Sequence, residues 1–394
     1  MGTQVVVLES AVALARHGAV SELRAVVGES APASALERLR AAGAELVPVR
    51  SRGGAGPSLR SADLVYRPCQ VATLQDVRLL EDLAPRVVIA YLDTIAYNNP
   101  TYFASSHTWT AYRAATGLSF ASSDGIAFLS RETERMARAS GLVAPPGSRV
   151  VYPGVAGPAM GADEVRPAAL GRVPDGFLLY LGVAYRHKNR VGVLRTFEAL
   201  WAEGWRGHLV LAGAEPPQGG SRDEEVRYLR GRPEWDGHVV RLGPVGEGER
   251  EWLYRHCGVV LYPSLAEGFG LVPFEAALRG VPCLSTRAGA LDEVLPADLP
   301  TLPPGDPAGA AAAVLEVCER QEVARSIVEL LAVQAGLYTW ERAACSLVGY
   351  FEDVIGSGYA PFPGRGEKGP ATVSAGQQAR WRPAVRLPGG RTKA

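Results

Sequence analysis

The sequence predicts an α/β protein made of two Rossmann-like, doubly wound domains that face each other across a cleft. Short β-branched runs alternate with longer Ala-, Leu- and Arg-rich segments along most of the 394 residues. A Pro- and Gly-rich stretch without strong periodicity, 154–174, separates two such sets. Strands that alternate with helices form parallel sheets covered on both faces, and this length suits two domains. We expect the first domain at 1–160 and the second at 173–340.

The strands of both domains are expected at continuous apolar runs, because parallel strands are buried on both faces. In the first half these runs are 22–27, 44–49, 63–66, 86–93, 125–130 and 149–154. In the second half they are 177–182, 208–213, 238–243, 258–263 and 281–286. Amphipathic stretches between them, such as 34–43, 131–141 and 190–204, predict helices.

The C-terminal part divides into a helix and a tail. The helical pattern at 340–356 predicts a last helix, and we expect 341–360 to cross back and complete the first domain. Residues 361–394 contain seven Lys or Arg, one Glu and many Gly and Pro. Such a composition does not bury a core, so it predicts a disordered basic tail.

The composition excludes several classes of function. Lys+Arg and Asp+Glu both number 41, so no net charge recruits nucleic acid. Five cysteines without C-x-x-C spacing argue against a zinc site or a disulfide framework. Neither a signal peptide nor a run of about 18 apolar residues is evident. We expect a cytoplasmic protein, with peripheral contact of the tail at the inner membrane face as the alternative.

The strongest chemical signal is the pair of glutamates in the segment 266–282, AEGFGLVPFEAALRGVP. Glu267 falls in a loop after an apolar strand, where a carboxylate can accept hydrogen bonds from sugar hydroxyls. Glu275 falls in the first turns of the next helix, where it can hold two hydroxyls of a ribose. The ordinary alternative, a solvated glutamate and a helix-start glutamate, does not explain the strand, turn and helix around them.

The backbone between the two glutamates predicts an anion site. Gly268 and Gly270 let the chain approach a ligand closely. The amides around Leu271 and Val272 begin a helix and so present N–H groups to a negative charge. Hydroxyl-binding groups on both sides of an anion site outline a nucleotide sugar.

The segment resembles the E-(seven residues)-E signature of the retaining glycosyltransferases of the GT-B fold, family four, also called glycosyl transferases group 1. The resemblance covers most of the chain. Its further segments are 92–103, 125–130 and 149–155 in the first half, and 180–200, 208–213, 239–245, 287–295 and 339–351 in the second. It implies that a hexose moves from a nucleotide sugar to an acceptor with retention of configuration.

The resemblance also implies roles for basic residues. Charge develops on the leaving diphosphate, and cations stabilise it more in the transition state than in the ground state. Lys188 matches the phosphate-binding lysine of the family. The family often has an arginine where this chain has Val183, so Arg186 is expected as the second catalytic cation, with Arg190 as the alternative.

The remaining donor contacts also follow from the resemblance. Glu267 would hold the donor sugar near the reacting carbon, and Glu275 the ribose. The other expected donor-binding residues are Gly268, Phe269, Gly270, Leu271, Val272, Gly243 and Val245. No D-x-D motif is present, so the resemblance implies no metal. No cofactor is expected beyond the cosubstrate, a GDP- or UDP-sugar.

Two departures from the family lie in the first domain. The sequence begins at what looks like the first loop and helix, with Gly2 as a remnant of the loop, so this domain is expected to lack its first strand. The family often has His-Asp after the fourth strand, where this chain has Leu92–Asp93. Gly2 and Asp93 are the expected residues of the acceptor side, although Asp93 equally fits a strand-end cap.

Three functions remain open from the sequence. The first is a working glycosyltransferase, with GDP-mannose slightly favoured as donor and a sugar, lipid or metabolite as acceptor. The second is a nucleotide-sugar epimerase of the same fold, although the sequence shows no histidine and carboxylate set for it. The third is a catalytically silent accessory protein. Acceptor specificity is expected in the loops 51–62 and 98–121.

Overall fold

The computed structural model describes residues 2–48, 62–158, 163–357 and 382–386. The chain forms two compact units. The first domain contains Gly2–Pro100, Ser105–Gly154 and the residues from Tyr338 onward. The second domain contains Val155–Leu337 together with the short segment Thr101–Ala104. Each is an α/β unit around its own sheet, as the sequence predicts.

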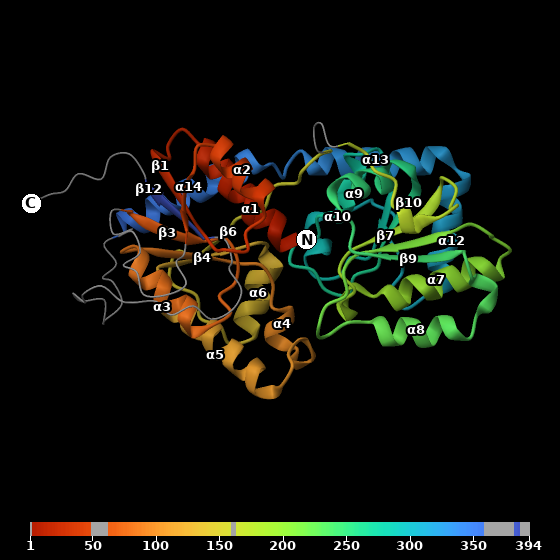
Figure 1. Ribbon diagram of the computed structural model, residues 1–394, viewed down its shortest axis with the longest axis horizontal. Helices are drawn as coiled ribbons and strands as arrows, with labels where there is room; N and C mark the ends of the chain where they lie inside the picture. The colour runs from red at the N-terminus through yellow and green to blue at the C-terminus, as the bar shows by residue number, and fades with distance from the viewer. Residues whose placement is uncertain (1, 49–61, 159–162, 358–381, 387–394) are drawn as a thin grey trace, which may run out of the picture. The chain divides into compact units, whose positions relative to one another are not determined.

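The first domain carries helices on both faces of its sheet. Its elements are α1 (Gly2–Arg16), β1 (Glu22–Val27), α2 (Ala33–Ala41), β2 (Glu45–Pro48), β3 (Leu64–Arg67), α3 (Leu74–Leu83), β4 (Val87–Tyr91), α4 (Ile95–Asn98), α5 (Ser106–Ser122), β5 (Gly125–Phe128), α6 (Arg131–Ala139), β6 (Arg149–Val150), α14 (Trp340–Gly356) and β12 (Arg382–Arg386). Figure 1 shows α1, α2 and α14 on one side of the strands and α3 and α5 on the other.

The sheet of this domain has the strand order β2-β1-β12-β3-β4-β5-β6. The pairs β1–β2, β3–β4, β4–β5 and β5–β6 are parallel, whereas β12 is antiparallel to both of its neighbours. The helix α1 precedes β1, as the sequence predicts. The place between β1 and β3 is filled from the C-terminal part of the chain. The prediction of a disordered tail is therefore wrong for Arg382–Arg386, because main-chain pairing offsets their polar composition.

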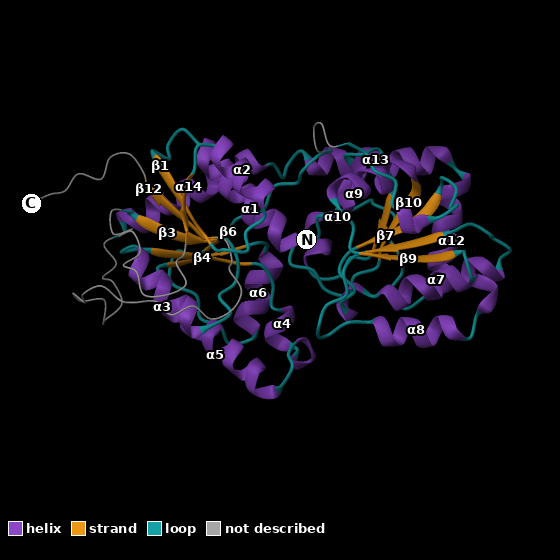
Figure 2. Cartoon of the chain, viewed as in Figure 1, coloured by secondary structure: helices purple, strands orange, loops and turns teal. Residues whose placement is uncertain are grey.

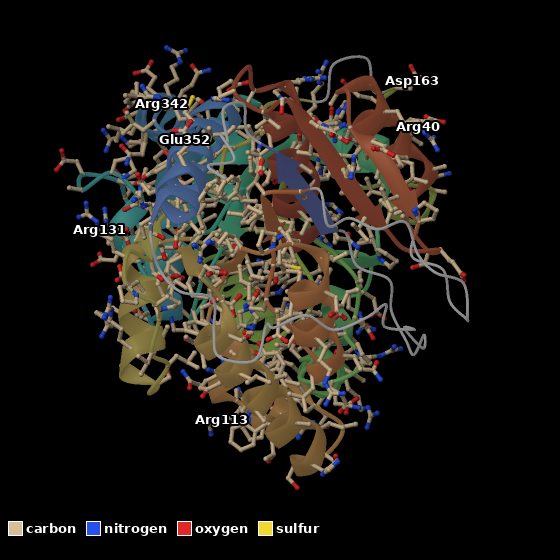
Figure 3. All side chains as sticks on the ribbon, turned by 90° about the vertical axis from the view of Figure 1, so that its left-hand side faces the viewer. Arg40, Arg113, Arg131, Asp163, Arg342 and Glu352 are labelled. Atoms are coloured by element: carbon tan, nitrogen blue, oxygen red, sulfur yellow. The ribbon has the colours of Figure 1, made fainter. Side chains whose placement is uncertain are left out.

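Two further predictions about this domain need correction. Gly2 is the exposed first residue of α1 and not part of a loop. Most of the expected acceptor loop 98–121 is helix α5, which Ser105 and Thr108 begin with a capping box. On α5, Arg113 lies over the rings of Tyr97 and Trp109, 4.6 and 5.0 Å from their centres. Arg113 is labelled in Figure 3. Of the other expected loop, 51–62, all but Ala62 lies outside the described residues.

The second domain also covers its sheet on both faces. Its elements are β7 (Phe177–Leu181), α7 (Arg190–Ala202), β8 (Leu209–Ala212), α8 (Arg222–Arg230), β9 (Val239–Gly243), α9 (Glu247–His256), β10 (Cys257–Tyr262), α10 (Val272–Ala277), β11 (Cys283–Ser285), α11 (Ala290–Val294), α12 (Pro307–Glu319) and α13 (Gln321–Ala335). Within this domain, Figure 2 shows α7 and α8 on one side of the strands and α9 and α13 on the other.

The second sheet is entirely parallel, with the order β11-β10-β7-β8-β9. Its first strand in the chain, β7, pairs with β8 on one side and with β10 on the other. The direction of winding therefore reverses between β7 and β10. In open α/β sheets this reversal leaves a crevice at the carboxyl ends of the two strands, where ligands bind.

Candidate functional site

Lys188 and Glu267 come together at this reversal point of the second sheet. Lys188 lies in the short 3-10 helix Arg186–Lys188, which follows β7. Glu267 lies in the loop that follows β10. Both loops leave carboxyl ends of adjacent parallel strands, so their side chains meet at the edge where the fold places ligands.

A three-way polar contact forms the centre of the site. The Lys188 Nζ atom lies 2.6 Å from Glu267 Oε1 and 3.1 Å from the hydroxyl oxygen of Tyr262. That hydroxyl donates to the same Glu267 oxygen at 2.5 Å. The Lys188 and Glu267 side chains are 19% and 8% exposed, so the ion pair is largely withdrawn from water. Tyr262 is the last residue of β10, and the apolar run alone does not reveal its polar role.

The environment keeps Glu267 ionised and Tyr262 protonated. Burial opposes the charge on Glu267, but Lys188 and the hydrogen bonds from Lys188 and Tyr262 outweigh burial and lower the pKa of the carboxyl. Burial raises the pKa of the Tyr262 hydroxyl well above its usual value, and the neighbouring Glu267 raises it further. The site therefore holds a carboxylate that accepts from one cation and one neutral hydroxyl.

Asn189 joins the two loops that carry these groups. It has left-handed backbone angles, with φ of 57°, a conformation that asparagine tolerates better than most residues. Its side-chain oxygen caps α7 by accepting from the Gly192 amide at 3.1 Å. Its side-chain nitrogen donates to the Pro263 carbonyl at 3.2 Å. A Cβ on Gly192 would lie 2.4 Å from the Asn189 side chain, so the cap requires glycine there.

The loop of Glu267 is held from the other side by Gly289. The Ala290 amide donates to the Glu267 carbonyl at 3.1 Å. Gly289 has φ of 63°, and a Cβ there would lie 2.9 Å from both the amide nitrogen and the carbonyl oxygen of Glu267. The turn that contains Gly289, within the resembling segment 287–295, thus positions Glu267. The sequence did not indicate this role.

The glycine-rich turn after Glu267 packs against the protein. Gly270 has φ of 92°, and a Cβ there would lie 2.4 Å from a Leu291 methyl group. Phe269 is buried, with its ring 5.8 Å from that of Phe274. Leu271 precedes α10, which starts at Val272. Helix α10 has six residues and Pro273 in its first turn, so it offers fewer free amides than the sequence suggests.

Glu275 has a different partner from the other predicted carboxylate. It is buried in α10 and accepts a hydrogen bond from the Tyr254 hydroxyl at 3.2 Å. Burial and this carboxylate raise the pKa of Tyr254 well above its usual value. Glu275 is thus held by Tyr254 of α9, whereas Glu267 is held by Lys188 and Tyr262.

The two other predicted cations are already paired. Arg186 is half exposed and its Nε atom lies 3.0 Å from Glu224 of α8. Arg190 is buried 3.4 Å from Glu225. In the part of the chain that the structure describes, neither guanidinium contacts Lys188 or Glu267, so one of the three expected cations lies at this point.

An aromatic cluster lies beside Lys188. The Tyr102 hydroxyl lies 2.7 Å from His187 Nδ1. The ring centres of Tyr102 and Tyr185 are 5.2 Å apart, and those of Tyr185 and His187 are 5.5 Å apart and nearly parallel. Burial lowers the pKa of His187 to about 4, and the adjacent Lys188 charge contributes. His187 is therefore neutral near pH 7, and its Nδ1 atom can accept a hydrogen bond from the Tyr102 hydroxyl.

The other predicted residues lie at further strand ends. Gly243 ends β9 with φ of 72°, and its carbonyl accepts from the Gly213 amide at 2.7 Å. Val245 follows and is buried. In the first domain, the Asp93 side chain accepts from the Ile95 amide at 2.9 Å, at the start of α4.

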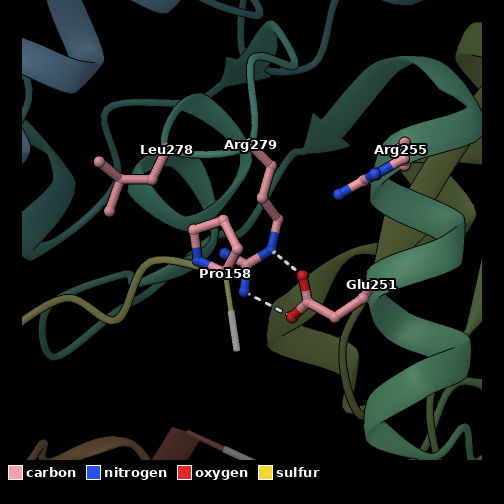
Figure 4. A pocket seen from close by; sticks show the side chains of 5 residues that line it. All are labelled: Pro158, Glu251, Arg255, Leu278 and Arg279. Atoms are coloured by element: carbon pink, nitrogen blue, oxygen red, sulfur yellow. Dashed lines mark hydrogen bonds and ion pairs between the residues drawn. The ribbon is translucent and has the colours of Figure 1, made fainter. Parts of the chain in front are cut away.

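A separate pocket of about 250 Å³ lies in the second domain (Figure 4). Pro158, Glu251, Arg255, Leu278 and Arg279 line it. Arg279 makes two bonds to Glu251, of 2.6 and 2.7 Å, and another to the Gly157 carbonyl at 3.1 Å. These bonds join the first residues of the domain and α9 to the turn that follows α10. Neither Lys188 nor Glu267 lines the pocket.

No group of three or more metal-binding side chains occurs among the described residues. No helix in the described ranges is long and apolar enough to span a bilayer.

The fold and the site together define a class of protein. Residues 163–330 match the sequence family described as glycosyl transferases group 1. The second domain therefore matches this family, and the predicted resemblance is confirmed for residues 163–330.

The curated relatives that the chain matches include glycosyltransferases. O-antigen chain mannosyltransferase B of Escherichia coli is 27% identical over 179 residues, which is 45% of this chain and 46% of that protein. D-inositol 3-phosphate glycosyltransferase of Pseudarthrobacter chlorophenolicus is 37% identical over 76 residues, 19% of this chain and 18% of that protein. The matched part thus spans less than half of either relative.

Solved structures confirm the fold over most of the chain. The HepE protein of Anabaena, solved with UDP and glucose, has a TM-score of 0.63 at 16% identity, over 89% of this chain and 96% of that chain. Sucrose-phosphate synthase of Thermosynechococcus elongatus has a TM-score of 0.59 at 17% identity, over 84% and 95%. These similarities establish the two-domain GT-B fold.

Proposed function

We propose that this protein is a metal-independent, retaining glycosyltransferase that moves a hexose from a nucleoside diphosphate sugar to a sugar, lipid or metabolite acceptor. The observation that carries the proposal is the contact of Lys188 with Glu267 and Tyr262 at the reversal point of the second sheet. When the bond between sugar and diphosphate breaks, negative charge grows on the diphosphate, and a cation stabilises that charge. The hydroxyls of the donor sugar need hydrogen-bond acceptors, and a carboxylate supplies them.

In the free protein Glu267 neutralises Lys188. A donor diphosphate would take over Lys188, and Glu267 would then accept from the donor sugar while Tyr262 continues to donate to it. Lys188 would thereby stabilise the charge that develops on the leaving diphosphate. Glu275, buried beside Tyr254, remains our candidate for the ribose.

Mannose is the favoured sugar. The mannosyltransferase of Escherichia coli supports this choice, as does the sequence around Lys188. The HepE structure with UDP and glucose supports a nucleoside diphosphate donor but not a particular base.

Product analysis with a panel of donors tests the proposal. Purified protein is incubated with GDP-mannose, UDP-glucose and UDP-N-acetylglucosamine, with sugar, phosphosugar and lipid acceptors, with and without EDTA. We expect a product with one donor, with retained anomeric configuration by NMR and no effect of EDTA. Lys188→Ala should lower turnover about 100-fold or more, whereas Arg222→Ala, at an exposed arginine of α8, should not. Unchanged turnover in Lys188→Ala would show that Lys188 does not stabilise the leaving diphosphate.

A further inference from the structure

The thiol of Cys345 lies against the imidazole of His17 in the first domain. Cys345 is in α14, and His17 directly follows the last residue of α1. The Cys345 Sγ atom lies 3.4 Å from His17 Nε2, although the two residues are 328 positions apart in the chain. Figure 1 shows α1 and α14 on the same side of the first sheet. A thiol within hydrogen-bond reach of an imidazole is an arrangement that makes cysteines reactive in proteins.

The two helices leave this pair at the surface. Helix α14 buries Ala344 and Leu347, close to Cys345 in the sequence, and α1 buries Leu14, three residues before His17. Cys345 itself is exposed, and His17 is half-buried. Neighbouring residues on both helices therefore hold the pair in place, while the thiol stays accessible to a small molecule in the solvent.

The backbone fixes the hydrogen of the neutral His17 ring on Nε2. The Ala19 amide donates to His17 Nδ1 at 3.3 Å. A neutral imidazole carries one hydrogen, so a ring whose Nδ1 accepts carries it on Nε2, the atom that faces Cys345. Two main-chain bonds hold this turn, from the His17 amide to the Leu14 carbonyl at 3.1 Å and from the Val20 amide to the His17 carbonyl at 2.9 Å. The imidazole therefore donates its hydrogen to the sulfur.

A hydrogen bond donated to the sulfur of Cys345 favours the thiolate. The donor stabilises a negative sulfur more than a neutral one. Protonation of His17 would keep the Nε2 donor and add a positive charge beside the sulfur, so both forms of the ring act in the same direction. The thiolate is the form of cysteine that attacks disulfides.

The other four cysteines lack this combination. Three are buried or half-buried in the described part of the chain: Cys69, Cys257 and Cys283. Burial raises the pKa of the last two thiols. Cys318 is exposed, but partial burial of its thiol and the Glu319 carboxylate raise its pKa. Cys345 therefore differs from the other four in having both an exposed position and a hydrogen-bond donor at its sulfur.

We propose that Cys345 is a reactive thiol that forms mixed disulfides with small-molecule disulfides, and that His17 activates it. The Cys345 thiolate attacks one sulfur of the small disulfide. A bond between that sulfur and Cys345 forms as the original disulfide bond breaks, and the other half leaves as a thiolate that takes a proton from water. The small disulfide is thus the oxidant, and one of its halves is reduced to a thiol. This inference does not depend on the transferase activity.

Peptide mapping of the full chain tests the proposal. The protein is incubated with oxidised glutathione near neutral pH, and mass spectrometry follows the glutathione adduct at each cysteine. We expect Cys345 to be modified about ten times faster than Cys318, which serves as the exposed reference in the same molecule. An equal or lower rate at Cys345 would overturn the proposal.

The variant His17→Phe tests the role of the histidine. It keeps an aromatic ring but removes the donor, so the rate at Cys345 should fall about fivefold or more relative to the rate at Cys318. His107→Phe, at an exposed histidine of α5, should leave this ratio as in the wild type. An unchanged ratio in His17→Phe would overturn the proposal.

Unfolding of the wild-type protein gives a measurement that needs no variant. In urea the contact between His17 and Cys345 is lost, so the rates at Cys345 and Cys318 should come within about twofold of each other. A preference of about tenfold that persisted in urea would come from the residues next to Cys345 in the sequence, and it would overturn the role of His17.

Discussion

The Nζ atom of Lys188 lies 2.6 Å from the Oε1 atom of Glu267, and these two residues follow strands that are neighbours in the sheet but far apart in the chain. The contact joins the residue expected to bind phosphate to the residue expected to bind sugar. Each side chain satisfies the charge of the other.

The ion pair should show strong coupling in stability. Removing one partner of a buried pair costs about 3–5 kcal/mol because the other charge is left unpaired. We therefore expect Lys188→Met to destabilise the protein by about 3 kcal/mol. The double variant Lys188→Met/Glu267→Gln should lose less than the sum of the single variants. Urea unfolding measures these free energies, and an additive double variant would mean that the pair does not interact.

The Tyr262 hydroxyl should matter for turnover. Tyr262→Phe removes a hydrogen bond to a carboxylate, which is worth about 1.5–3 kcal/mol. If Glu267 must keep its orientation in the transition state, turnover falls about 10- to 100-fold while the protein stays folded.

Tyr180 provides the matched control for that variant. It lies on the adjacent strand β7, is fully buried, and its hydroxyl has no hydrogen-bond partner in the described part of the chain. Tyr180→Phe should therefore leave turnover unchanged. A similar loss in both variants would assign the effect of Tyr262→Phe to packing.

Much of the second domain could be predicted from the sequence. The five apolar runs correspond to β7–β11, and the spacing of Glu267 after β10 places it at a ligand edge. The partners of these side chains could not be predicted. Arg186 and Arg190 each lie two residues from Lys188, yet each pairs with a carboxylate of α8.

The first domain shows a different limit of sequence patterns. Its six parallel strands have the expected apolar runs, but RPAVR at 382–386 has two arginines and a proline and gives no strand signal. Its conformation depends on two open strand edges elsewhere in the chain. The strand propensity of a short segment does not report main-chain hydrogen bonds with strands that lie far away in the sequence.

Gly289 should be required for the position of Glu267. In Gly289→Ala the new Cβ would lie 2.9 Å from two backbone atoms of Glu267, so that loop must move. We expect turnover to fall at least tenfold. Gly280→Ala is the control, because Gly280 also has a positive φ, 76°, but open space around it. Steady-state kinetics of both variants would separate the effect of the contact with Glu267 from the effect of backbone strain at a positive φ. Equal losses of turnover in the two variants would contradict the positioning role of Gly289.

His187 should make the protein less stable in mild acid. Burial, together with the Lys188 charge, lowers its pKa to about 4 in the folded protein, against about 6.5 in the unfolded chain. Because the folded protein keeps His187 neutral, this residue's contribution to the free energy of unfolding is complete above pH 6.5. The contribution is lost as the pH falls from 6.5 towards 4. The slope is at most about 1.4 kcal/mol per pH unit. In His187→Phe, urea unfolding should show a smaller decline between pH 7 and pH 5 than in the wild type. The control is His107→Phe, at an exposed position on α5, which should keep the wild-type decline. An equal decline in all three proteins would contradict the prediction, because His187 would then take up a proton as readily in the folded protein as in the unfolded one.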